Sequence, residues 1–366
     1  MTDSIFSPSF GNKPSNLIGR DHVMGMLTGG LKAMPGSKER ARLIIGQRGM
    51  GKTVLLLELA EFARANGFIV ASPTVVSSDM LDRILEKLER DGEKLLQKEK
   101  VRITGASVGI LGFSAGIQTE NNDQPKRSFA YRLQDLCEKA NEEGKAVLIL
   151  VDEVQSNSEE LKKLIIAYQE LVGEGCDIAI VMAGLPSSIS RTLNQHVLTF
   201  LNRASKMNLE PISVREIAVY YRDCFRKLGI DMDERRISMA ANRTEGSPYM
   251  MQLIGHYITI SASENGKLSD EDFIHALAAA QDEFIDDICG TTLSTLSEMD
   301  VEFLKAMSAD SDESAIKDIC ARLEVDSAYA NRYKSRLIQS GVIQQKRRGY
   351  VEFAVPYLKD FLKQGD

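Results

Sequence analysis

Apolar residues in the first two-thirds of the chain form short continuous runs, which alternate with stretches of helical periodicity. Apolar runs of this length, bounded by glycine and polar residues, are typical of strands buried on both faces of a parallel sheet. The pattern therefore predicts an α/β fold in which helices flank a parallel sheet. The predicted strands are residues 41–46, 68–76, 146–154, 177–184 and 205–213.

A long interval separates the second predicted strand from the third. Residues 81–98 have helical periodicity with many charged positions, whereas residues 103–118 combine glycines with alternating apolar residues. This alternation favours a surface hairpin over a helix. The segment is too short to span a membrane, and no other apolar run reaches the length of a membrane helix. The sequence therefore predicts no membrane partner.

The pattern changes to helices at residue 213. Four segments in succession begin with a capping Ser or Asp, and three of them end at or near Gly, which predicts a helical lid domain over residues 213–295. From residue 296, helix, short turn, helix and basic hairpin follow in the order of a winged helix-turn-helix domain, residues 296–366. Residues 1–212 then form the sheet domain.

Composition narrows the class of protein. The chain has 366 residues, a formal net charge of -7 and a pI near 5.4, which argues against coating nucleic acid through overall charge. Its five cysteines and four histidines are dispersed, without a C-x-x-C motif. This dispersion favours a reducing, cytoplasmic location and argues against a cysteine or histidine metal site.

A glycine-rich loop joins the first predicted strand to the next helix. Its sequence, GQRGMGKT, has the spacing of a phosphate loop in the required setting between strand and helix. Glycines let successive backbone N–H groups point at a phosphate, lysine reaches the β- and γ-phosphates, and threonine offers a hydroxyl to Mg²⁺. The candidate nucleotide-binding residues here are Gly46, Gln47, Arg48, Gly49, Met50, Gly51, Lys52, Thr53 and Val54.

An acidic pair in LILVDEVQ ends the third predicted strand. Asp152 at the carboxyl edge of the sheet can order Mg²⁺ through water, beside the Thr53 hydroxyl, and Glu153 next to it can polarise an attacking water. The pair predicts an enzyme that hydrolyses a nucleoside triphosphate, with Mg²⁺ as its metal.

These motifs together resemble the AAA+ superfamily, in the branch similar to origin-recognition and archaeal ATPases and related to the STAND signalling ATPases. The resemblance covers nearly the whole chain and implies ATP and Mg²⁺ as cofactors. The matching pieces are LIGRDHVMGML, GQRGMGKT, ILVDEVQ, AGLP, FLNRASKMNLEPIS, TEGSPYMMQLIG and the terminal winged helix.

The resemblance implies further site residues. Residues 17–20 would pack near the adenine, which assigns Ile18 and Arg20 to the nucleotide site. Arg203 resembles the arginine that a neighbouring subunit, or the same chain, brings to the γ-phosphate, and action in trans would imply an ATP-dependent homo-oligomer. The alternative for Arg203 is a surface salt-bridge partner.

The chain departs from the family pattern at two places. The fourth strand ends in Ala183 and Gly184 where a polar sensor is expected, and Ser187 or Ser188 could substitute only if the loop curls back. Pro248 stands where many members carry a lid arginine. Both departures predict slow hydrolysis that acts as a timer on a conformational state.

Basic residues concentrate near the C-terminus, where six of them lie within residues 327–350 without an acidic one. This reversal of charge favours contact with double-stranded DNA phosphates, and the alternative is a STAND-like regulator whose winged helix docks a protein partner or autoinhibits. A third hypothesis, a phosphotransferase, lacks the expected arginine-rich substrate lid. The candidate DNA-binding residues are Arg332, Lys334, Arg336, Lys346, Arg347 and Arg348.

Overall fold

The computed structural model describes residues 5–8, 17–104, 127–263 and 265–364. The hairpin expected at residues 103–118 lies outside this description except for its first two residues, which end a helix. Within the described ranges, no helix has the length and apolar character needed to cross a membrane.

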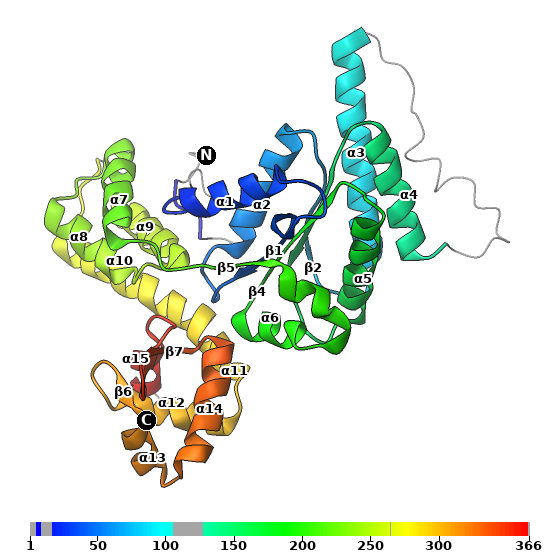
Figure 1. The fold of residues 1–366 in the computed structure, drawn as a ribbon. Coiled ribbons are helices and arrows are strands. Elements are labelled where there is room, and N and C mark those ends of the chain that lie inside the picture. The colour runs from blue at the N-terminus through cyan, green and yellow to red at the C-terminus, as the bar shows by residue number, and fades with distance from the viewer. Residues whose placement is uncertain (1–4, 9–16, 105–126, 264, 365–366) are drawn as a thin grey trace.

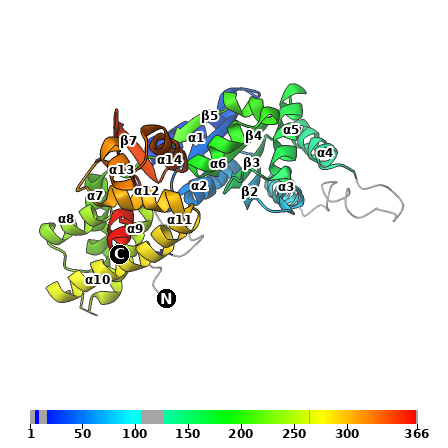
Figure 2. The same ribbon diagram turned by 90° about the horizontal axis from the view of Figure 1, so that it is seen from below.

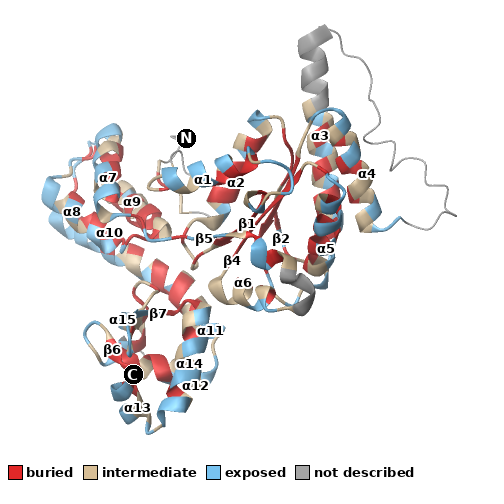
Figure 3. Cartoon of the chain, viewed as in Figure 1, coloured by how far each residue is buried: buried red, intermediate tan, exposed pale blue. Residues whose placement is uncertain are grey.

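A parallel five-stranded sheet organises the first part of the described chain, in the order β2-β3-β4-β1-β5. The central strands β3 and β4 are buried along their whole length, which explains their continuous apolar sequences (Figure 3). The prediction of a parallel sheet is confirmed. The strands are β1 (Ala41–Ile45), β2 (Ile69–Val75), β3 (Val147–Asp152), β4 (Ile178–Gly184) and β5 (Ser205–Asn208).

Helices cover both faces of this sheet (Figure 1). One buried cluster joins α1 and α2 to one face, and another joins α3, α4 and α5 to the opposite face. The sheet is therefore the middle layer of three. The elements are α1 (Asp21–Leu31), η1 (Lys38–Arg40), α2 (Lys52–Ala65), α3 (Met80–Thr104), α4 (Phe129–Glu142), α5 (Glu159–Gly173), α6 (Pro186–Leu193) and η3 (His196–Arg203).

A bundle of helices, here called the lid, follows β5. Ser and Asp side chains cap α8, α9 and α10 as the sequence predicts, each accepting a backbone N–H of its helix. The prediction was wrong for α7, because the side chain of Ser213 accepts no such bond. From α10 the chain continues through the π-helical turn η4 into α11. The lid elements are α7 (Val214–Leu228), α8 (Glu234–Arg243), α9 (Pro248–Ser261) and α10 (Asp270–Phe284), followed by η4 (Ile285–Gly290) and α11 (Thr291–Ser294).

Residues 296–364, here called the C-terminal region, combine helices with a small antiparallel sheet of order β6-β8-β7. Its buried residues belong to the same hydrophobic cluster as those of the lid. Figure 2 shows α14 of this region beside α6, and the two helices are in contact. The elements are α12 (Glu298–Ser308), β6 (Ser314–Ala315), α13 (Ile316–Leu323), α14 (Ser327–Ser340), β7 (Ile343–Arg347), β8 (Tyr350–Phe353) and α15 (Leu358–Gln364).

Phe6, near the start of the chain, packs inside the lid. Its side chain is 1% exposed, and its ring centroid lies 5.4 Å from that of Phe225. The backbone N–H of Ser7 donates to Oε1 of Gln252 at 3.0 Å. A Cβ at Gly255 would lie 2.2 Å from the Phe6 ring, so only glycine leaves room for the ring at this position of α9.

Candidate functional site

The glycine-rich loop leaves β1 and ends where α2 begins, as the sequence predicts. Gly49 and Gly51 have φ angles of +74° and +78°, in the left-handed region that favours glycine. Lys52 is the first residue of α2, so the free N–H groups of that helix face the loop. The loop therefore has the backbone geometry of an anion-binding site.

Lys52 reaches back across the loop mouth. Its Nζ donates to the backbone oxygens of Gly46 at 3.0 Å and Gln47 at 2.7 Å. Burial lowers the pKa of Lys52 to about 8, and the charge of Asp152 offsets only part of this effect. A bound phosphate would offer this ammonium a stronger partner than the two carbonyl groups.

The lowered pKa of Lys52 predicts a pH dependence of nucleotide binding. Phosphate binding requires the ammonium, which is already present below about pH 8, whereas above it each binding event must take up a proton. We expect nearly constant ATP affinity between about pH 6.5 and 7.5, and about tenfold weaker binding at pH 9.

Calorimetry in buffers of different ionisation enthalpy measures both affinity and proton uptake. The control is Lys52→Arg, whose guanidinium stays charged throughout, so its proton uptake should be close to zero. Equal ATP affinity of the wild type at pH 7 and pH 9 would contradict the assignment of Lys52 as the titrating group.

Thr53 and Asp152 lie together at the carboxyl edge of the sheet. The Thr53 hydroxyl donates to Oδ2 of Asp152 at 2.5 Å, and Asp152 is 4% exposed. The described residues contain no cluster of three or more His, Cys, Asp or Glu side chains that could hold a metal. Mg²⁺ in phosphate-loop sites needs only one or two protein oxygens, because phosphates and waters complete its shell. The hydroxyl and carboxylate therefore fit Mg²⁺.

Glu153 begins the turn that leaves β3. Its backbone N–H donates to Oδ1 of Asp152 at 2.9 Å, its φ is +52°, and its side chain is exposed. Left-handed backbone at a non-glycine residue costs about 1 kcal/mol or more. The turn places an exposed carboxylate directly after Asp152, the candidate metal ligand.

Arg20 bonds the backbone of the phosphate loop. Its guanidinium is buried and donates to the backbone oxygens of Glu210 at 2.7 Å and Met50 at 3.4 Å. Burial lowers its pKa, and the charges of Glu210 and Glu216 oppose that shift. Ile18 packs against the hydrophobic cluster of the lid. Arg20 thus contacts the loop backbone, a role that the sequence pattern alone did not indicate.

The lid touches the phosphate loop through the first turn of α9. The Tyr249 N–H donates to the Gly49 oxygen at 3.2 Å, and a Cβ at Gly51 would lie 3.9 Å from Pro248. Pro248 occupies the first helical position, which needs no N–H donor. It therefore contributes close packing beside the loop, and no charge.

Arg203 lies at the amino ends of the parallel strands, whereas the phosphate loop lies at their carboxyl ends. It ends η3 with an exposed side chain, just before β5. Ser205 at the start of β5 pairs with Arg42, whereas the phosphate loop follows Ile45. Three residue steps along a strand span about 10 Å, so the backbone of Arg203 lies at the opposite end of the strands from the phosphate loop of its own chain. At the tip of β4, Ser187 and Ser188 lie in the first turn of α6.

Two of the candidate DNA-contacting arginines bind carboxylates of the C-terminal region. Arg336 donates to Asp300 at 2.7 Å and to the Ser297 hydroxyl at 2.6 Å. Arg347 donates from Nε to Glu313 at 2.9 Å. Both guanidinium groups therefore have internal partners in this conformation.

The remaining basic candidates differ in their surroundings. Lys346 pairs with Glu352 at 3.2 Å. Among the described residues, Arg332, Lys334 and Arg348 form no ion pair within 4.0 Å. Of the six candidates, only these three side chains lack an ion-pair partner within the described residues.

The C-terminal region contacts the phosphate loop directly. The Gln47 side-chain amide donates to the backbone oxygen of Gly341, which ends α14. A Cβ at Gly341 would lie 1.7 Å from Gln47 Nε2 and 2.9 Å from Pro186 of α6. A cavity of about 740 Å³ lies between the loop, residues 208–211, the lid, η4, α11 and the C-terminal region. No sequence pattern indicated the contact of Gln47 with Gly341.

This fold and this loop are those of the P-loop AAA+ class of proteins. Residues 16–181 match the family described as "AAA ATPase domain". Residues 286–362 match DUF8462, a domain of unknown function. None of the curated proteins compared with the chain matches it.

Solved archaeal structures share the fold. The Walker-type ATPase PABY2304 of Pyrococcus abyssi has a TM-score of 0.71 at 16% identity, over 98% of this chain and 99% of that one. The ORC2 protein of Aeropyrum pernix, in ADPNP-ADP complexes, has a TM-score of 0.66 at 16% identity, over 98% and 95%. Cdc6p of Pyrobaculum aerophilum has a TM-score of 0.51 at 17% identity, over 100% and 96%. The predicted likeness to origin-recognition-type AAA+ proteins is thereby confirmed for the fold.

Proposed function

We propose that this chain is a slow, Mg²⁺-dependent ATPase in which the nucleotide state controls docking of the C-terminal region on the phosphate loop. The contact of Gln47 with Gly341 carries the proposal. The same Gln47 also accepts the Lys52 ammonium on its backbone oxygen at 2.7 Å. When a phosphate draws Lys52 away, Gln47 loses one of these partners, so binding and docking are coupled through a single residue.

Slow hydrolysis follows from the groups around the loop. Glu153 supplies a water-polarising carboxylate, and Thr53 and Asp152 form the metal site. The first turn of α9, by contrast, carries Pro248 and no cation. A missing charge near the γ-phosphate removes part of the transition-state stabilisation. Turnover then sets how long the protein stays in its ATP-bound state.

Double-stranded DNA is a second candidate for what the switch controls. The order of α13, α14 and the β7–β8 hairpin is that of a winged helix, and Arg332, Lys334 and Arg348 offer charges to phosphates. In the docked arrangement α14 contacts α6. Release of the C-terminal region would therefore expose more of α14.

The variant Gly341→Ala tests docking. The added Cβ overlaps the Gln47 side chain, so we expect the C-terminal region to leave the loop, with several-fold faster nucleotide exchange and a larger radius of gyration. Gly349→Ala is the matched control. Gly349 also has a left-handed backbone, with a φ of +82°, but the space around its Cβ position is open. Gly349→Ala therefore introduces the same backbone strain as Gly341→Ala, without a steric overlap.

Exchange rates and scattering profiles that are equal for the two glycine variants would refute the docking proposal. Retention on duplex DNA, measured over a range of salt concentrations, tests the second candidate with the same proteins. If DNA is the partner, Gly341→Ala should bind it more tightly than Gly349→Ala. Loss of this difference when Arg332 is also changed to Ala would place the contact on α14.

A further inference from the structure

Helix α3, which packs on one face of the sheet, also bonds the free side of the edge strand β2 through its side chains. β2 is the outermost strand next to β3, and Lys87 and Asp91 lie one helical turn apart on α3. Asp91 accepts the Val70 N–H at 2.8 Å and the Arg64 guanidinium at 2.6 Å. Side chains of α3 thus bond backbone groups of β2 that no neighbouring strand can reach.

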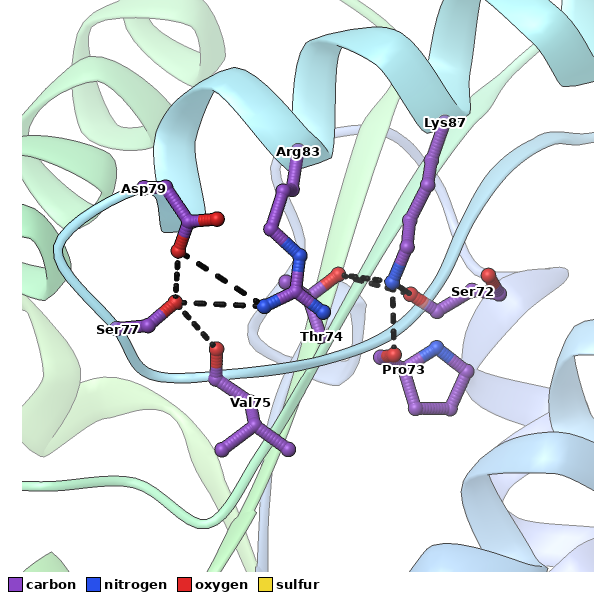
Figure 4. A network of polar contacts seen from close by, with 8 residues as sticks. All are labelled: Ser72, Pro73, Thr74, Val75, Ser77, Asp79, Arg83 and Lys87. Atoms are coloured by element: carbon purple, nitrogen blue, oxygen red, sulfur yellow. Dashed lines mark hydrogen bonds and ion pairs between the residues drawn. The ribbon is translucent and has the colours of Figure 1, made fainter. Parts of the chain in front are cut away.

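Lys87 bonds an irregular part of β2. The register shifts between Ala71 and Thr74, where β2 holds one residue more than the facing part of β3. The Lys87 ammonium donates to the oxygens of Ser72 at 3.1 Å and Pro73 at 2.9 Å, and to the Thr74 hydroxyl at 2.7 Å (Figure 4). All three donors of one ammonium are therefore used at the bulge.

The bulge ends directly beside the metal-ligand position. After it, Thr74 pairs with Val151 and Val75 pairs with Asp152. Thr74 is fully buried, and Asp152 is the last residue of β3. A change of one residue at the bulge would shift the β2 partner of Asp152 by one position.

We propose that Lys87 is a positioning residue for the Mg²⁺ site. Its ammonium fixes the β2 bulge, the bulge fixes the pairing of Val75 with Asp152, and that pairing holds the carboxylate against Thr53. This role rests on the proposed nucleotide site, because Lys87 acts only through Asp152. The loop of residues 46–53, which binds the phosphates themselves, does not depend on the bulge.

The test compares ADP affinity with and without Mg²⁺, so it needs no hydrolysis. Lys87→Met keeps an aliphatic side chain of similar length and removes the three donors. We expect Mg²⁺-free ADP binding within about twofold of the wild type, and about a tenfold smaller gain in affinity from Mg²⁺, as for other residues that orient a metal ligand. A purely structural defect would weaken both measurements together.

Arg83→Met is the matched control. Arg83 lies one turn before Lys87 and bonds the Ser77 hydroxyl at 3.4 Å and Asp79 at 3.9 Å, beyond the bulge (Figure 4). Its loss should leave the Mg²⁺ gain unchanged. If Lys87→Met does not fold, Thr74→Val removes one of the three acceptors and should reduce the gain in the same direction.

A full Mg²⁺ gain in Lys87→Met, or an equal loss in Arg83→Met, would overturn the role of Lys87. A wild type that binds ADP without any Mg²⁺ gain would instead overturn the metal site at Thr53 and Asp152, and the role of Lys87 with it. The two failures are therefore distinguishable.

Discussion

The variant Glu153→Gln should bind ATP as tightly as the wild type and hydrolyse it about 10²- to 10⁴-fold more slowly. The amide keeps the shape of the carboxylate but cannot accept a proton from water. Glutamine also tolerates the backbone at this turn as well as glutamate does, so the loop geometry is preserved. Calorimetry of ATP binding and single-turnover hydrolysis measure the two halves of this expectation.

Glu159→Gln is the control for Glu153. Glu159 is exposed at the start of α5 and pairs with Lys162 at 2.6 Å, so the change removes one carboxylate near the same turn without touching the site. Its hydrolysis rate should match the wild type. Turnover by Glu153→Gln at the wild-type rate would assign the water-polarising role to another group.

The second large effect concerns Arg203. If its guanidinium completes the site of a neighbouring subunit, Arg203→Ala should bind ATP normally and lose turnover by about 10³-fold. Arg203 lies at the amino ends of the strands, away from its own phosphate loop at the carboxyl ends, and this position favours action in trans. A mixture of Arg203→Ala and Glu153→Gln should then regain activity, because one subunit supplies Glu153 and the other supplies Arg203.

Lys206→Ala is the matched control, since Lys206 is an exposed cation on β5, three residues further along the chain. It should not change turnover. A loss of less than about threefold in Arg203→Ala would make Arg203 an ordinary surface cation, whose ion pairs contribute about 0 to 1 kcal/mol. Activity of the wild type that is independent of its concentration would also exclude action between subunits.

Local patterns predicted the parts of this fold that local forces determine. Continuous apolar runs mark strands such as β3 because both faces of the sheet are covered. The last strand was predicted too long, as residues 205–213, whereas β5 ends at Asn208. Pro211 has no N–H to donate to a strand, and the Ile212 N–H instead donates to the Gly246 oxygen of the lid.

In the candidate site, too, the sequence motifs predicted some contacts and gave no signal for others. The two motifs assigned Thr53 and Asp152 to one metal site, and the structure brings their side chains into contact at the carboxyl edge of the sheet. The contact of Gln47 with Gly341 joins residues 294 positions apart and leaves no periodic signal. Counting charges near the C-terminus could not show that Arg336 binds Asp300, since the acid lies outside the counted segment.

Phe6 gives the lid an unusual order of assembly during synthesis. The Phe6 ring is synthesised more than two hundred residues before its neighbours Phe225 and Gly255. At about 5–20 residues per second, the ring must wait on the order of ten seconds or more for its binding place. The lid core therefore closes only after residues 225–255 have been translated, and the Phe6 ring remains available to chaperones until then.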